Sequence, residues 1–269
     1  MQTFTDLYKH RFILENLVSK NLKVLYRNMA LGVVWSVVNP LVMVSVLTAV
    51  WVVFFGQELS FALSVLVALV PYNLFVYCLS GCTSVIRDNA PLVKKVSFPR
   101  QILPVSVVLT HVVQFPIPLS LVVIGLLVIP KDHPTVTMNL LWLIPIFVLQ
   151  LGLSFGVGFL VAALNAKYRD VQYIVESVLV VLFWLCPILY EASAKLNAEI
   201  AAGSFGEWAW YAYFLNPLAG ILEGYRSVLY LGRPPEMAVM LMALIMTLLI
   251  GVLGVRKFWV HEREFADLI

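Results

Sequence analysis

Long apolar stretches alternate with short charged segments along this chain. Six stretches are mostly apolar and each is about 20 residues long or longer, the length that a helix needs to cross the hydrocarbon core of a bilayer. They cover residues 33–55, 61–83, 102–129, 139–164, 172–190 and 237–255. Pro71 interrupts the second, and Pro104, Pro116 and Pro118 predict kinks in the third. The pattern predicts an all-α integral membrane protein, with six transmembrane helices within residues 33–255.

The composition supports a location in the bilayer. Hydrophobic residues make up 61% of the 269 residues and charged residues only 12%, about half the charged fraction of a typical soluble domain. The three cysteines, Cys78, Cys82 and Cys186, all lie inside apolar stretches. This placement argues against both a disulfide framework and a zinc site.

The distribution of cations predicts the orientation. If the N-terminus is cytoplasmic, 14 of the 18 Lys and Arg residues fall in cytoplasmic segments and 4 in external ones. An excess of Lys and Arg marks the cytoplasmic loops of membrane proteins. We therefore expect both termini in the cytoplasm, with residues 256–269 as a cytoplasmic tail.

Residues 1–30 contain a basic amphipathic helix. One face carries Phe4, Leu7, Tyr8, Leu14, Val18, Leu22 and Leu25, and the opposite face carries Lys9, Asn16, Lys20, Lys23 and Arg27. Such a helix can lie in the cytoplasmic interface of the membrane. It is either a plain membrane anchor or a docking surface for a cytoplasmic partner.

The connection between the second and third stretches is strongly charged. Its sequence, RDNAPLVKKVSFPR at residues 87–100, holds four cations and one carboxylate. The positive-inside tendency explains the cations but not the apolar residues among them, which are Leu92, Val93, Val96 and Phe98. Apolar centres with polar rims are typical of docking surfaces. We expect a short helix lying across the membrane plane, with its apolar side against a partner.

The longest external connection, residues 191–236, is partly apolar. Its aromatic segment, residues 208–232, is broken at Asn216-Pro217 and at Gly220, so each half is too short to span. The pattern fits two short re-entrant helices and equally an aromatic belt at the membrane interface.

A few polar or small residues stand out in the apolar segments. His111 and Gln114 predict an interhelical hydrogen bond or a functional polar pair. Glu176 can pair with Arg169 near the interface. Glu223 and Arg226, one helical turn apart, are a compensating pair inside the membrane or an exposed pair of little energetic value. A row of small residues, Gly152, Gly156 and Gly158, permits close helix packing.

Recognisable catalytic signatures are absent from the sequence. It contains no P-loop GxxxxGK[ST], no HExxH, no GxSxG and no Cys/His metal spacing. A membrane-embedded transferase would need a cluster of carboxylates or histidines, which Asp170, Glu176 and Glu191 do not form in sequence. A passive channel would have no use for the loop at 87–100. We expect no catalytic residue, no metal site and no nucleic-acid partner.

Five segments resemble the permease subunits of ABC-2 type polysaccharide exporters, the group that includes O-antigen, capsule and teichoic acid exporters. They are LYRNMALGVVWSVVNPL (25–41), NAPLVKKVSFPRQILPV (89–105), LNAKYRDVQYIV (164–175), CPILYE (186–191) and YFLNPLAGILEGYRSVLYLG (213–232). The resemblance implies a single transmembrane domain over residues 1–269 that exports lipid-linked polysaccharide across a bacterial plasma membrane. An ABC-2 exporter of small drugs or lipids is the alternative.

The resemblance also implies partners and site residues. Family members are homodimers that bind two copies of a separate ABC ATPase, so ATP and Mg²⁺ would be held by that partner and this chain would bind no cofactor. Residues 1–30 would match the interface helix, and residues 208–231 the re-entrant gate, with Asn216, Pro217, Glu223 and Arg226 as gate candidates. The coupling helix that contacts the ATPase would comprise Ala90, Pro91, Leu92, Val93, Lys94, Lys95, Val96, Ser97 and Phe98.

Aromatic rings are the candidates for the carbohydrate route, because they can stack on the C–H faces of sugars. The candidates are Tyr72, Phe75, Phe183, Trp184 and Tyr190. Contact with lipid or packing between helices explains each of these aromatic residues as well.

Overall fold

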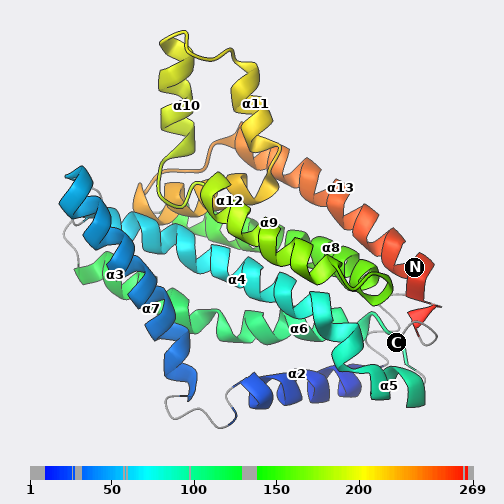
Figure 1. The fold of residues 1–269 in the computed structure, drawn as a ribbon. Helices are drawn as coiled ribbons and strands as arrows, with labels where there is room; N and C mark the ends of the chain where they lie inside the picture. The colour runs from blue at the N-terminus through cyan, green and yellow to red at the C-terminus, as the bar shows by residue number, and fades with distance from the viewer. Residues whose placement is uncertain are drawn as a thin grey trace.

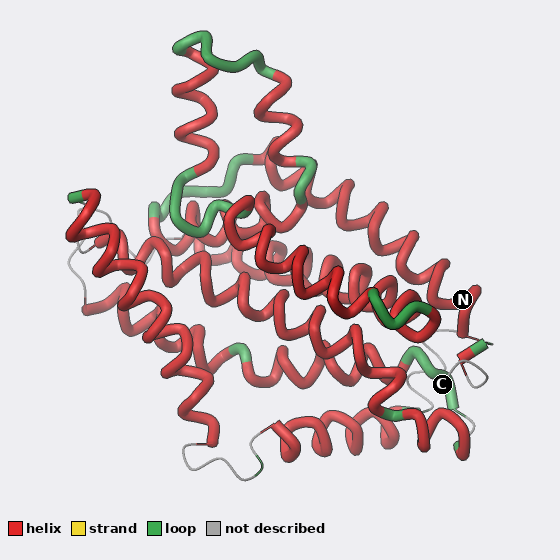
Figure 2. Tube along the Cα trace, viewed as in Figure 1, coloured by secondary structure: helices red, strands yellow, loops and turns green. Residues whose placement is uncertain are grey.

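The computed structural model describes residues 10–25, 27, 32–56, 58, 60–96, 98–128, 138–262 and 264–265. Every regular element within these ranges is a helix, and loops connect the helices (Figures 1 and 2). Several residues singled out in the sequence, Phe4, Leu7, Tyr8, Lys9 and Ser97, lie outside the described ranges.

Five helical segments are long and apolar enough to cross a membrane. They are α3 (Trp35–Phe55), α4 (Ser60–Asp88), α6 with α7 (Ile102–Gln114 and Pro116–Val128), η2 with α8 (Met138–Trp142 and Leu143–Lys167) and α13 (Met237–Glu262). They confirm five of the six predicted stretches as long apolar helices. Of the kinks predicted in the third stretch, the one at Pro116 corresponds to the break at Phe115. Pro104 lies within the first turn of α6 and Pro118 within the first turn of α7, so neither interrupts a helix.

The fifth predicted stretch, residues 172–190, is helical over a shorter range. Its helix, α9, covers only Val171–Leu185. At about 1.5 Å per residue it is about 22 Å long, short of the ~30 Å hydrocarbon core. The chain then turns through residues 186–190, where Cys186, Ile188 and Leu189 are buried.

Helix α4 forms the centre of the bundle, between α6, α8 and α9 (Figure 1). Buried amides on α8 bond to carbonyls of this central helix. Gln150 Nε2 donates to the carbonyl of Pro71 at 2.7 Å, and Asn165 Nδ2 donates to that of Thr83 at 2.7 Å. Tyr225 completes the first group by donating its hydroxyl to Gln150 Oε1 at 2.7 Å. These bonds satisfy polar groups that would be costly if unpaired in an apolar interior.

Glycines bring α8 and α13 into backbone contact. A Cβ on Gly254 would lie 2.0 Å from the Gly156 carbonyl oxygen, and one on Gly156 would lie 2.8 Å from Gly251 Cα. Gly152 faces the same helix, with Thr247 Cγ2 3.3 Å from a Cβ built there. The structure therefore confirms the close packing that the row of small residues predicts.

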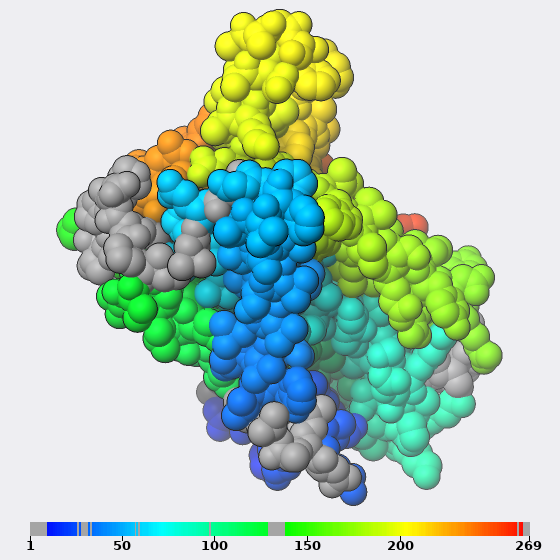
Figure 3. Space-filling model, turned by 60° about the vertical axis from the view of Figure 1, so that its left-hand side comes forward, coloured from blue at the N-terminus to red at the C-terminus, as the bar shows by residue number. Residues whose placement is uncertain are grey.

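Two features lie at opposite ends of the bundle (Figure 1). At one end α2 (Arg11–Leu25) packs along α6 and buries Leu17. At the other end α10 (Ala192–Ala201) and α11 (Trp208–Phe214) form a hairpin that projects from the body (Figure 3). Beneath this hairpin α12 (Pro217–Tyr225) is buried along its whole length.

The face of α2 that packs on the bundle overlaps the predicted apolar face. Leu14, Val18 and Leu22 are partly buried, whereas Leu25 is exposed. Asn21 Nδ2 lies 3.5 Å from both Ser106 Oγ and Thr110 Oγ1 of α6. The helix therefore packs through a mixed seam rather than a purely apolar one.

Candidate functional site

The charged loop at 87–100 folds into a short helix, α5 (Ala90–Lys95). Asn89 positions it, because its carbonyl accepts hydrogen bonds from the N–H groups of Leu92 (2.9 Å) and Val93 (3.0 Å). Its side chain donates to the carbonyl of Val85 at 2.9 Å and accepts from Lys20 Nζ at 2.9 Å. Asn89 thereby joins the end of α4, the start of α5 and helix α2.

The burial pattern divides the predicted coupling residues into two groups. Val93 is 3% exposed and Phe98 is 9% exposed, and both pack into the core of this chain. Val96 is 45% exposed, and Pro91, Lys94 and Lys95 are also exposed. Val93 and Phe98 therefore hold α5 in place, while Pro91, Lys94, Lys95 and Val96 form its open surface. Ala90 and Leu92 are intermediate in exposure.

The segment after α5 is tied to the end of α13. The backbone N–H of Arg100 donates to Glu262 Oε1 at 2.9 Å, and Arg100 Nη1 donates to the carbonyl of Glu262 at 3.0 Å. Nearby, Lys167 at the end of α8 lies 3.9 Å from Glu264. Hydrogen bonds therefore connect the residues on either side of α5 to α4, α2 and α13.

Helix α9 carries two different exposed faces. Ile174, Val178, Val181 and Leu185, at positions i, i+4, i+7 and i+11, form an apolar face. Tyr173, Ser177, Val180 and Trp184, with the same spacing, lie beside Gln172 and Glu176 and form a mixed face. A helix with two such faces suits two environments, an apolar one on one side and water or protein on the other.

Glu176 gives the mixed face its charge. It is exposed and accepts a hydrogen bond from Gln172 Nε2 at 3.1 Å. The pair with Arg169 that the sequence suggested is absent from the ion pairs of the described residues. A carboxylate at this position is costly against lipid tails and is stabilised by water.

The predicted pathway aromatics lie in different surroundings. Trp184 is 63% exposed on the mixed face of α9, and Phe183 beside it is partly buried. Tyr72 and Phe75 lie in the core, where the Tyr72 hydroxyl donates to the carbonyl of Leu179 at 2.5 Å. Because Tyr72 and Phe75 are only 4% and 3% exposed, packing explains both of them. Tyr190 is intermediate, and its hydroxyl lies 3.1 Å from that of Tyr213 on α11.

Arg226 stabilises the non-helical segment that follows α9. Its side chain is fully buried and donates to the carbonyls of Ile188 (2.9 Å) and Tyr190, and to Ser64 Oγ (3.1 Å). Glu223 Oε2 lies 3.4 Å from Arg226 Nη1. The pair is therefore internal rather than an exposed surface pair. It supplies donors to carbonyls left free where α9 ends.

The break at Asn216-Pro217 starts a helix. Asn216 Oδ1 accepts a hydrogen bond from the N–H of Leu218 at 3.1 Å, and Pro217 occupies the first turn of α12. The second predicted break, at Gly220, is wrong, because α12 runs through it. Gly220 instead allows α13 to approach, since a Cβ there would lie 3.1 Å from Val239 Cγ1. The chain then makes one π-helical turn, Arg226–Tyr230, which contains the buried arginine.

Comparisons with known proteins identify relatives of this chain. Residues 14–230 match the family described as ABC-2 type transporter. An "O-antigen export system permease protein RfbA" of Myxococcus xanthus is 32% identical over 271 residues, which is 98% of this chain and 98% of that protein. Two proteins of the same name from Klebsiella pneumoniae are each 26% identical over 214 residues, 79% of this chain and 78% of theirs. This multi-pass membrane chain belongs to the ABC-2 type transporter family.

Proposed function

We propose that this chain is the permease subunit of an ABC exporter that moves lipid-linked polysaccharide across the bacterial plasma membrane. The relative from Myxococcus xanthus, which matches over nearly the whole length of both chains, is named for O-antigen export. This name favours polysaccharide over small drugs or lipids as the substrate. The sequence contains no P-loop, so ATP and Mg²⁺ would be bound by a separate ATPase subunit.

The anchored helix α5 is the observation that carries the coupling proposal. It exposes Pro91, Lys94, Lys95 and Val96 while Asn89 and Arg100 tie its two sides to α4, α2 and α13. A small surface fixed so firmly to several helices suits the transfer of motion from a partner. In this arrangement the α5 end is cytoplasmic, in line with the concentration of cations there.

A sixth span would arise from α9 together with the buried segment that follows it. Non-helical backbone is tolerated at membrane depth where protein covers it and satisfies its carbonyls. Arg226 gives such cover to Ile188 and Tyr190. The buried α12 would then enter the outer leaflet as a re-entrant helix, with the α10–α11 hairpin outside the cell.

The mixed face of α9 supports a pathway between two copies of the chain. Exposed Glu176 is unfavourable against lipid, and exposed Trp184 offers a ring on which a sugar can stack. In a homodimer this face would border an aqueous route, while the apolar face of Ile174 and Val178 contacts lipid.

Deletion of the gene for this chain in its own bacterium tests the proposed function. Polysaccharide on its lipid carrier should accumulate inside the cell, and polysaccharide should disappear from the cell surface. Inactivating the P-loop lysine of the partner ATPase should give the same result. Normal surface polysaccharide in cells without the chain would refute the proposal.

The coupling surface has a separate test in the same cells. Val96→Asp or Lys95→Glu should weaken co-purification of the ATPase, because both positions are exposed on α5. Trp208→Asp, on the hairpin at the other end of the bundle, is the matched control because Trp208 is also exposed. Val93 is unsuitable for this test, because a charge at that buried position would disrupt the fold.

A further inference from the structure

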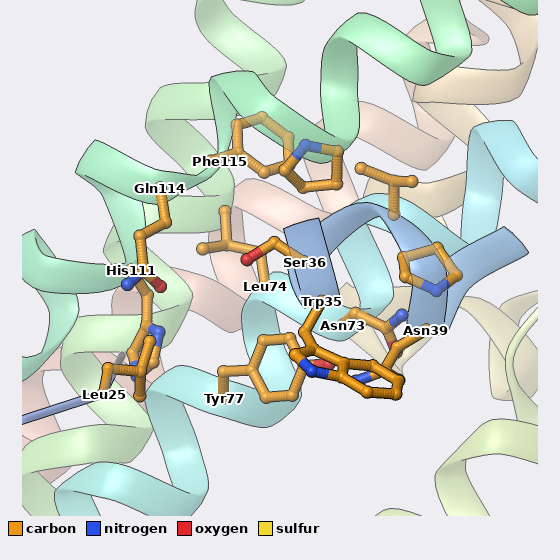
Figure 4. A pocket seen from close by; sticks show the side chains of 13 residues that line it. Leu25, Trp35, Ser36, Asn39, Asn73, Leu74, Tyr77, His111, Gln114 and Phe115 are labelled. Carbon is orange, nitrogen blue, oxygen red and sulfur yellow. The ribbon is translucent and has the colours of Figure 1, made fainter. Parts of the chain in front are cut away.

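A cavity of about 200 Å³ lies between α3, α4 and the end of α6 (Figure 4). It is far larger than the ~30 Å³ that one water molecule occupies in the liquid. Most of its lining surface is apolar, and six polar side chains also border it, which are Ser36, Asn39, Asn73, Tyr77, His111 and Gln114. His111 and Gln114 of α6 lie on one side, and Asn39 of α3 lies on the other (Figure 4).

Two of these side chains have hydrogen-bonding capacity left over. His111 Nδ1 and Gln114 Nε2 are buried, and neither has a hydrogen-bond partner within the described part of the chain. The interhelical bond that the sequence suggested therefore does not use these two atoms. A buried polar atom without a partner is costly, and the cost is removed when water or a ligand binds to it.

The chemistry of the lining side chains restricts which kinds of ligand the cavity can bind. No charged side chain is among the described residues that line the cavity, so a phosphate or a metal ion would find no counter-charge. A lipid tail would leave the buried His111 Nδ1 and Gln114 Nε2 without partners. An uncharged group with many hydroxyls fits, because amides and imidazole both donate and accept hydrogen bonds.

Aromatic rings complete the match to a sugar. Trp35 and Phe115 line the same cavity, and the Tyr77 ring lies 5.8 Å from the His111 ring at an angle of 30°. Trp35 and Tyr77 are 42% and 46% exposed, so the cavity opens on the side of the bundle. A pyranose has both an apolar C–H face for such rings and hydroxyls for the amides.

We propose that this cavity is a binding site for one uncharged sugar unit. The assignment rests on the proposed function, since the sugar would belong to the lipid-linked polysaccharide. Asn73 lies near the middle of the 29-residue α4, and Leu25 at the end of α2 also borders the cavity. The site thus reaches from the end of the interface helix into the bundle.

Equilibrium binding of radiolabelled octyl β-D-glucoside tests this site. The complex of the chain with its ATPase would be held in lipid nanodiscs, with the glucoside below its micelle concentration. Binding should saturate and should weaken at least tenfold in Asn39→Leu and Asn73→Leu, which keep similar volume but lose the amide. Asn197→Leu, at an exposed position on α10, should bind as wild type.

Competition separates the sources of the signal. Displacement by free glucose supports recognition of the sugar itself, and failure of octylphosphocholine to displace the glucoside supports recognition of its head group. Equal displacement by octylphosphocholine would overturn the proposal, because the cavity would then bind the shared alkyl chain. Absence of saturable binding, or wild-type binding by both variants, would also overturn it.

A disulfide formed between copies of Asn39→Cys would indicate that a second copy covers the cavity, and this would contradict a sugar site. Co-purification of the ATPase reports that a variant is folded and assembled, and surface polysaccharide reports its export function. A variant that retains the ATPase but loses both sugar binding and export supports the sugar site. Lost sugar binding with normal export contradicts the assignment of this sugar to the exported substrate and leaves the proposed export function unaffected.

Discussion

Arg100 and Glu262 join two distant parts of the chain through a pair of hydrogen bonds. The Arg100 N–H donates to the Glu262 carboxylate at 2.9 Å, and the guanidinium donates to the Glu262 carbonyl at 3.0 Å. This contact fixes the segment after α5 to the end of α13. Motion of α5 without motion of α13 would break both bonds, so the two elements should move together.

Replacing Glu262 tests this link. Glu262→Ala should loosen residues 98–101, because a hydrogen bond to a charged group contributes about 1.5 kcal/mol, roughly tenfold in local opening. Hydrogen–deuterium exchange of this segment measures the effect. Glu262→Gln should retain most of the protection, since its amide oxygen still accepts from Arg100. Glu264→Ala is the control for an exposed carboxylate, and equal loosening by Glu264→Ala would contradict a specific role for Glu262.

The contact between α8 and α13 predicts opposite results for two glycines. Gly254→Ala places a methyl group 2.0 Å from the Gly156 carbonyl oxygen, so the helices must separate, at a cost of about 1–3 kcal/mol or more. At Gly251 a Cβ meets nothing within 4 Å, so Gly251→Ala should be neutral or stabilising by up to ~1 kcal/mol. Unfolding in detergent measures both. Similar stability of the two variants would refute the backbone contact.

Arg226 should be among the most sensitive positions in the chain. Arg226→Met leaves buried Glu223 without its cation and the carbonyls of Ile188 and Tyr190 without their donor. Loss of one partner of a buried pair costs about 3–5 kcal/mol. Thermal unfolding in detergent should show this loss, with Arg233→Met at an exposed position as the control. Wild-type stability of Arg226→Met would contradict the proposed support for the segment after α9.

Cysteine labelling distinguishes the two faces of α9. In membranes, Ser177→Cys and Val180→Cys should react with a charged thiol reagent, because the mixed face would border water. Ile174→Cys and Val178→Cys should react at least tenfold more slowly, because lipid would cover them. All four positions are exposed in a single copy, and the native cysteines are buried. Equal labelling at all four positions would contradict an aqueous pathway along this face.

The sequence allowed the long helices to be predicted well, because about 20 apolar residues in a row have few alternatives. It could not show where α9 ends, since the bonds that stabilise the end come from Arg226, 38 residues after Ile188. It also could not separate exposed Val96 from buried Val93, because α5 is too short for periodicity to indicate a face. The row of small residues that contains Gly156 could be recognised in the sequence, whereas only the structure identifies Gly254 as the residue that packs against it.

The sequence also could not show which of the aromatic pathway candidates are buried. In a helix that is apolar all round, the side-chain pattern does not indicate which face is buried. Tyr72 and Trp184 therefore looked alike in the sequence, although one lies in the core and the other on the surface. The cavity beside His111 and Gln114 was only partly foreseeable, because Asn39 and Asn73 come from two other helices.

Photo-crosslinking from position 96 is the most direct test of the central claim, that a separate ATPase drives this permease through α5. A photoreactive residue at Val96 should capture the ATPase subunit in native membranes, whereas one at Trp208 on the distant hairpin should not. Capture at position 208 but not at position 96 would contradict a cytoplasmic ATPase acting through α5. Labelling of Val96→Cys by an impermeant thiol reagent added outside intact cells would contradict it as well.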